Sequence, residues 1–153
     1  MGYQTVVVGY DGSTDADLAV EAAADQADPD GKVHVVTASH PVSTARLVQE
    51  LQDLPEEYRY VYDHDAAERA RQHAALLRLR GRGVDGVGHV LPDDPATAIL
   101  DVARREAADL VVVGSRGLGG MRRFLRGSVS SRIAAHAPMS VLIVHDPDAT
   151  PPG

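Results

Sequence analysis

Short runs of apolar residues alternate along the chain with longer segments in which apolar residues recur at helical spacing. Five of the short runs are expected to be strands: Thr5–Gly9, Val33–Ala38, Val84–Leu91, Leu110–Val113 and Ser140–Val144. Most are continuously apolar, which is typical of strands buried on both faces of a parallel sheet. The pattern therefore predicts an α/β fold, a single doubly wound, Rossmann-like domain with helices on both faces of the sheet.

Four main helices are expected between the strands. They follow Ser13, cover Asp65–Arg80, cover Ala96–Ala107 after Pro95, and cover Val129–His136 after Ser128. The two serines are expected N-caps, and the turn signal Asp28-Pro29-Asp30-Gly31 is expected to end the first helix. Residues 39–62 show no clear period and are expected to form a helix-loop insert, with a short helix near Ala45–Leu54. The predicted domain covers residues 1–146, and a loose tail covers 147–153.

A run rich in glycine and arginine follows the fourth expected strand. From Gly114 to Ser130 it contains no acidic residue and four arginines, Arg116, Arg122, Arg123 and Arg126. Glycine lets backbone N–H groups approach an anion closely, because no Cβ stands in the way. The N-terminus of the following helix adds further N–H donors and a partial positive charge. We interpret the run as a phosphate-binding loop.

The composition of the rest of the chain limits the ligand and the location. The net charge is −7 although this run is purely basic, so the remaining surface would repel nucleic acid, and a small anionic ligand is favoured. Cysteine is absent, and there is neither a secretory signal nor an apolar run of membrane-spanning length. We expect a cytoplasmic protein without a membrane partner.

Better-known phosphate and catalytic motifs do not fit. The dinucleotide fingerprint lacks its third glycine after Gly117-Leu118-Gly119, and it would belong near the start of a βαβ unit. A lysine-dependent P-loop is excluded, since Lys32 is the sole lysine. The seven histidines show no metal-ligand spacing, and nucleophile-elbow and zinc-protease motifs are missing. No catalytic residue and no metal ligand is predicted.

The spacing Gly114-x2-Gly117-x9-Gly127-Ser128 resembles that of the ATP-binding members of the universal stress protein family. Val7–Ser13 and Ala137–Val144 extend the resemblance over nearly the whole chain. It implies a five-stranded parallel sheet in the order 3-2-1-4-5, a homodimer through Ser140–Val144, and ATP or ADP with Mg²⁺ held through the phosphates. The residues that it places at the nucleotide are Asp11, Gly12, Ser13, Ala38, Val113, Gly114, Ser115, Arg116, Gly117, Gly127, Ser128, Val129 and Ser130.

Several functions remain open from the sequence. The expected one is an ATP-binding regulatory protein of the stress response, which senses or stores nucleotide and signals through a dimer or partner surface. The alternative is a slow ATPase or phosphotransferase, for which no general base is visible. A structural protein with an empty loop is disfavoured by the intact glycine spacing. Asp11, in an Asp-Gly-Ser turn, is also compatible with a simple Asx turn.

Overall fold

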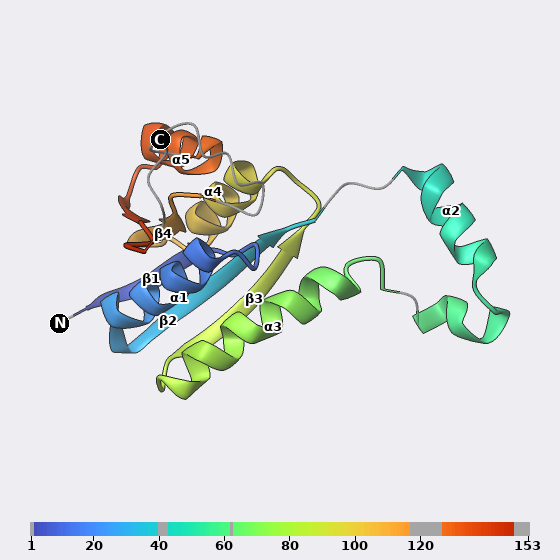
Figure 1. The fold of residues 1–153 in the computed structure, drawn as a ribbon, viewed down its shortest axis with the longest axis horizontal. Coiled ribbons are helices and arrows are strands. Elements are labelled where there is room, and N and C mark those ends of the chain that lie inside the picture. The colour runs from blue at the N-terminus through green and yellow to red at the C-terminus, as the bar shows by residue number, and fades with distance from the viewer. Residues whose placement is uncertain (1, 40–42, 62, 117–126, 149–153) are drawn as a thin grey trace.

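The valine-rich runs form a five-stranded parallel sheet (Figure 1). This computed structural model describes residues 2–39, 43–61, 63–116 and 127–148. The strands are β1 (Tyr3–Gly9), β2 (Ala27–Ala38), β3 (Asp85–Leu91), β4 (Leu110–Gly114) and β5 (Ser140–Val144). Their order is β3-β2-β1-β4-β5, which confirms the expected fold class and strand order.

Helices cover both faces of the sheet. The helices α1 (Thr14–Gln26) and α3 (Ala66–Gly81) pack on one face, and α4 (Pro95–Arg105) and α5 (Ser128–His136) pack on the other. Within the described ranges, no helix combines the length and the apolar character that crossing a membrane requires.

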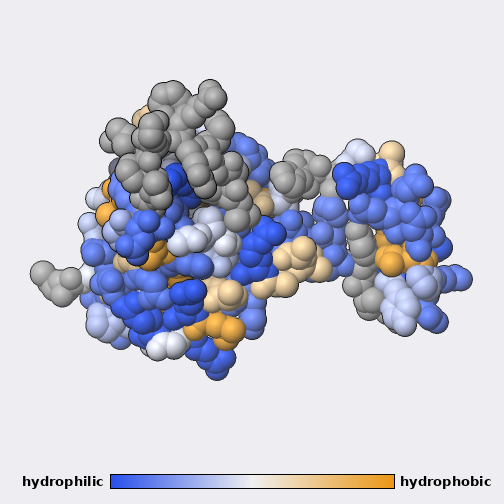
Figure 2. Space-filling model, in the orientation of Figure 1, coloured by the Kyte–Doolittle hydropathy of each residue, from blue (hydrophilic) through white to orange (hydrophobic). Residues whose placement is uncertain are grey.

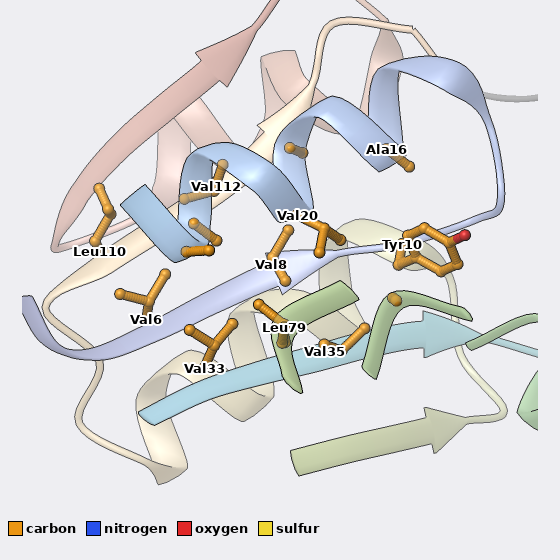
Figure 3. Close-up of a cluster of buried hydrophobic side chains, with 14 residues drawn as sticks. Val6, Val8, Tyr10, Ala16, Val20, Val33, Val35, Leu79, Leu110 and Val112 are labelled. Carbon is orange, nitrogen blue, oxygen red and sulfur yellow. The ribbon is translucent and has the colours of Figure 1, made fainter. Parts of the chain in front are cut away.

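The hydrophobic core consists of two clusters, one on each face of the sheet. Side chains of a strand alternate between the two faces, so Val6 and Val8 of β1 join the first cluster with Val20 and Leu79 (Figure 3). Val7 joins the second cluster with residues of α4 and α5. All five side chains are fully buried. Burial of one such side chain contributes about 1.5–3 kcal/mol, so the central strand is a rigid base for the loops at its end.

The expected insert forms an arm beyond the ends of β2 and β3 (Figure 1). It contains α2 (Thr44–Asp53), close to the short helix predicted near Ala45–Leu54, and the 3₁₀-helix η1 (Glu56–Val61). Hydrophobic residues are visible on this arm (Figure 2), and Val48 is 46% exposed.

Several element boundaries differ from the sequence prediction, and the largest difference is at the start of β2. β2 begins at Ala27 rather than Val33, because Ala27 pairs with Tyr3 before the chain bulges and the ladder resumes at Lys32. The turn residues predicted at 28–31 lie within this bulge, where Asp28 Oδ1 accepts the Asp30 N–H at 3.0 Å. α4 ends at Arg105 rather than Ala107, which adopts a positive φ of 50°. The bounds of β1, β3, β4 and α3 differ from the predicted ones by one or two residues.

Polar contacts connect α1 to α3 and to the end of β1. The hydroxyl of Tyr10 donates to Asp17 Oδ1 at 2.9 Å, and burial together with this carboxylate raises the pKa of Tyr10 to about 12. Arg78 of α3 lies 3.6 Å from Asp17 and 3.4 Å from Glu21, and Arg82 pairs with Glu21 and Asp25. Exposed pairs of this kind contribute about 0–1 kcal/mol each, so they align the helices more than they stabilise the fold.

A pair of histidines connects β2 to the edge strand β3 on the α4 face. His34 Nδ1 lies 2.9 Å from His89 Nε2, and the ring centroids are 5.1 Å apart. Glu106, which follows α4, lies 3.9 Å from His34 Nε2. Burial lowers the pKa of both histidines, and this is the largest effect on each. Lys32 also lowers the pKa of His34, which Glu106 and Asp85 only partly oppose. The neighbouring ring and Arg105 also lower the pKa of His89, which Glu106 only partly opposes.

This pair is expected to make the fold acid-sensitive. Because the folded-state pKa values are lowered, the unfolded chain binds more protons, and stability is lost as the pH falls below about 6.5. Urea unfolding at about pH 7.5 and about pH 5 should show a larger drop for the wild type than for a His34→Gln/His89→Gln double variant. His73→Gln, at an exposed position on α3, is the control and should keep the wild-type drop. An equal drop in the double variant would contradict the assignment.

Candidate functional site

The two loops predicted to form the site leave neighbouring strands. β1 pairs with β4 through Val6 with Leu110 and Val8 with Val112, and it pairs with β2 on its other side. The strand order therefore reverses at β1: β2 and β3 lie on one side of it, and β4 and β5 lie on the other. In open α/β sheets, ligands bind beyond the carboxyl ends of the strands at such a position.

The first loop, Asp11-Gly12-Ser13, connects β1 to α1. Asp11 Oδ1 accepts the Ser13 N–H at 2.9 Å, and Ser13 Oγ caps α1 by accepting the Ala16 N–H at 3.1 Å. Gly12 has a φ of 83°, which other residues rarely adopt. The Asx turn therefore exists, and the same turn holds the Asp11 carboxylate in one orientation at the carboxyl edge of the sheet.

A buried carboxylate of α1 holds the start of the glycine-rich loop. Asp15 is 6% exposed, and its Oδ2 accepts hydrogen bonds from Ser115 Oγ at 2.8 Å and from the Arg116 N–H at 3.0 Å. The Nε of Arg116 lies 3.9 Å from the same oxygen. A Cβ on Gly114 would lie 2.7 Å from the Asp15 Cβ, so only glycine fits at the end of β4. Ser115 and Arg116 thus position the loop through Asp15.

The two ends of the loop meet at the N-terminus of α5. The Gly127 N–H donates to the Ser115 carbonyl at 2.7 Å, and the Gly127 carbonyl accepts the Ser131 N–H at 3.1 Å. The prediction of Ser128 as N-cap is therefore wrong: Gly127 is the N-cap and Ser128 is the first helical residue, because the Ser131 bond already starts the helical ladder at Gly127. Ser130 is 1% exposed, and its Oγ donates to the Gly127 carbonyl at 3.0 Å.

Several backbone donors at this helix end have no partner among the described residues. The backbone N–H groups of Ser128, Val129 and Ser130 donate to no residue in the described part of the chain. The Ser128 side chain is exposed, whereas Val129 is partly buried against the second core cluster. Three N–H groups, one hydroxyl and the partial positive charge of the helix end provide the chemistry that binds an anion such as phosphate.

Some residues predicted for the site cannot be placed there by their side chains. Gly117, Arg122, Arg123 and Arg126 lie outside the described residues. Val113 is 4% exposed with its side chain in the second core cluster, so it faces the site only through its backbone.

The end of β2 forms the other side of the site. Ala38 pairs with Leu91 of β3, and the next N–H, that of Ser39, donates to the Leu91 carbonyl at 2.8 Å. Ser39 is 4% exposed, and its Oγ has no hydrogen-bond partner among the described residues. A buried hydroxyl without a partner is uncommon in a folded protein.

Asp15 is a residue of the candidate site that sequence reasoning missed. An acidic residue in the first turn of a helix is ordinarily explained by the helix dipole, and nothing near position 15 in the sequence indicates a contact with residues 115 and 116. The one feature of the sequence that could have indicated its role is an acidic side chain two residues after the N-cap Ser13, at the predicted site. Among the described residues, no group of three or more His, Cys, Asp or Glu side chains is arranged to hold a metal ion.

Both the sequence and the fold of this chain are similar to those of known proteins. The sequence profile of the universal stress protein family matches residues 2–145. A universal stress protein of Mycobacterium tuberculosis is 37% identical over 151 residues, which cover 94% of this chain and 97% of that protein. The crystal structure of a universal stress protein in complex with cAMP has a TM-score of 0.69 and 31% identity, covering 95% of this chain and 98% of that one. The universal stress protein from Archaeoglobus fulgidus in complex with dAMP, at 21% identity, a TM-score of 0.64 and coverage of 94% and 99%, supports the fold alone.

Proposed function

Because the chain belongs to the universal stress protein family, a family of stress-response proteins, we propose that it binds an adenine nucleotide at the carboxyl edge of its sheet. In this proposal the protein is regulatory, and its nucleotide occupancy is sensed by a second copy or by another protein. The observation that carries the proposal is the junction of Ser115 with Gly127, which brings both ends of the glycine-rich loop to the N-terminus of α5.

Each part of the nucleotide would be held by different elements. The phosphates would bind the N–H groups of Ser128 and Val129 and the glycine-rich loop, where small residues allow close approach. The Asp11 carboxylate would accept hydrogen bonds from the ribose hydroxyls, and the backbone at Ala38 would face the adenine edge. Ser115 and Arg116 donate to Asp15 and would position the loop.

We propose ATP or ADP, with Mg²⁺ held through the phosphates, as the bound species. The glycine spacing around Gly114 and Gly127 supports this choice, since a long glycine-rich loop suits a chain of phosphates. Mg²⁺ usually binds to substrate phosphates with few protein ligands, which fits a site without an acidic cluster in its described part.

A second candidate is cAMP, favoured by the similarity to the universal stress protein solved with that nucleotide. The two ligands make different demands, because cAMP carries a single phosphodiester charge and does not require Mg²⁺. Competition of cAMP against bound ATP, with and without EDTA, separates them. ATP affinity that falls on removal of Mg²⁺ supports ATP, and tighter binding of cAMP under both conditions supports the second candidate.

Replacement of Ser128 by alanine is expected to weaken ATP binding about tenfold or more, because a hydrogen bond to a charged group contributes about 1.5–3 kcal/mol. Isothermal titration calorimetry measures the affinity. Ser131→Ala is the matched control, since Ser131 is also an exposed serine of α5 but lies one turn further from the N-terminus. Wild-type protein without measurable affinity for ATP, ADP or cAMP would refute nucleotide binding itself.

We also propose a homodimer through Ser140–Val144. β5 is the last strand of the sheet and pairs only with β4 among the described strands. Its apolar side chains are partly buried. An apolar strand with an open edge tends to pair with another strand, and a second copy of the chain supplies one.

A further inference from the structure

The side chain of Arg71, on α3, lies directly over the first loop of the site. A Cβ on Gly12 would stand 2.6 Å from the Arg71 Cδ, 3.0 Å from its Cγ and 3.4 Å from its Nε. The stem of the arginine therefore occupies the space that the missing side chain of Gly12 leaves open. Gly12 lies between Asp11 and Ser13, so the guanidinium is held beside the residues of the first loop.

Arg71 differs from Arg69 and Arg78 of α3 and from Arg82, which follows the helix, because each of these three arginines has acidic partners. Arg69 lies 2.8 Å from Asp63, and Arg78 and Arg82 pair with acidic residues of α1. Arg71 is exposed, and within the described part of the chain it has neither a hydrogen bond nor an ion pair. The stem packs on Gly12 and so holds the guanidinium in place, and none of its five N–H groups has a partner among the described residues.

The position of α3 decides which part of a nucleotide Arg71 would meet. Gln72, the next residue, donates to the Val35 carbonyl at 3.1 Å and to Thr37 Oγ1 at 3.0 Å, so this turn of α3 lies over the end of β2. The glycine-rich loop follows β4, on the opposite side of β1. Arg71 therefore lies on the Ala38 side of the site, away from the proposed phosphate position. Ser39, whose Oγ has no partner among the described residues, is at the same strand end.

We propose that Arg71 is a base-binding residue on the Ala38 side of the site, where its guanidinium lies against the face of the nucleobase. The proposal rests on the nucleotide-binding function proposed above. A planar guanidinium stacks on aromatic rings, and its stem is already ordered on Gly12, so little further side-chain entropy is lost when a ligand binds.

The test compares adenosine with ATP on wild type, Arg71→Ala and Arg71→Lys. Arg71→Ala is expected to weaken both ligands by a similar factor of about ten, because stacking acts on the base that both share. Arg71→Lys keeps the charge but not the plane, and it is expected to lose most of the same affinity. Arg80→Ala is the matched control, since Arg80 is another exposed arginine of α3 without a partner in the described residues, and it should bind both ligands as the wild type does.

Three results would overturn the assignment: unchanged affinity in Arg71→Ala, a loss confined to ATP, which would indicate a phosphate contact, or full affinity in Arg71→Lys. Thermal unfolding of each variant shows whether a loss of binding reflects a loss of fold, and an equal melting temperature is expected because the side chain is exposed. Failure of the proposed function is distinct, since wild-type protein would then bind neither adenosine nor ATP.

Discussion

Replacing Asp15 with alanine is expected to lower the free energy of unfolding by about 2–4 kcal/mol and to weaken nucleotide binding about tenfold or more. The carboxylate is 6% exposed and accepts hydrogen bonds from Ser115 Oγ and from the Arg116 N–H. Removal leaves two donors without their partner, and each buried donor left unsatisfied costs about 1–3 kcal/mol. The loop then loses its connection to α1, and a flexible loop must be ordered again when a ligand binds.

Urea unfolding and calorimetric titration with ATP measure the two effects. Asp15→Asn keeps one acceptor oxygen of the same shape, so its losses are expected to lie between those of the wild type and the alanine variant. Asp17→Ala is the control, because Asp17 is in the same first turn of α1 but contacts Tyr10 and Arg78 instead of the loop. It is expected to lose some stability and to keep ATP affinity. Wild-type affinity in Asp15→Ala would show that the loop is positioned by other contacts.

The fold was predictable because its signals are local. Short, mostly apolar runs identified all five strands, and Pro95 and the glycine pair around Arg82 marked a helix start and a helix end. The strand order has no such local signal and came from the family resemblance. Pairing within the ladder was also unpredictable: the bulge between Ala27 and Lys32 depends on Tyr3 pairing with Ala27, a contact between distant residues.

The residues of the candidate site were predictable where the backbone conformation requires one residue type. They were not predictable where a side chain contacts a residue distant in the sequence. Gly12 and Gly114 were identified because a turn or a close approach requires glycine, and the structure shows the reason at each position. Asp15 and Arg71 were missed because their partners, Ser115 and Gly12, are distant in sequence. Gly127 rather than Ser128 is the N-cap because its carbonyl accepts the Ser131 N–H, while its own N–H donates to the distant Ser115 carbonyl.

Replacing Ile143 with proline is expected to convert the proposed homodimer into a monomer while leaving the fold intact. The Ser115 N–H donates to the Val144 carbonyl at 2.8 Å, so the backbone polar groups of Val144 face β4. These groups alternate along a strand, so those of Leu142 also face β4 and those of Ile143 face the open edge. Proline at 143 therefore removes an N–H that only a partner strand would use, and it obstructs pairing there. Sedimentation velocity at micromolar concentration measures the change.

The matched control is Leu142→Pro, whose N–H faces β4. It is expected to destabilise the chain itself by about 1–3 kcal/mol, the cost of a lost buried backbone hydrogen bond, and so to lower the melting temperature before any effect on assembly is considered. Ile143→Pro should keep a melting temperature close to that of a wild-type sample diluted until it is monomeric, because only the subunit interface is lost. A wild-type protein that sediments as a monomer at micromolar concentration would contradict the dimer. A dimer that survives Ile143→Pro would place the interface on another surface, because a proline on the shared edge cannot take part in a continuous ladder between two copies of β5.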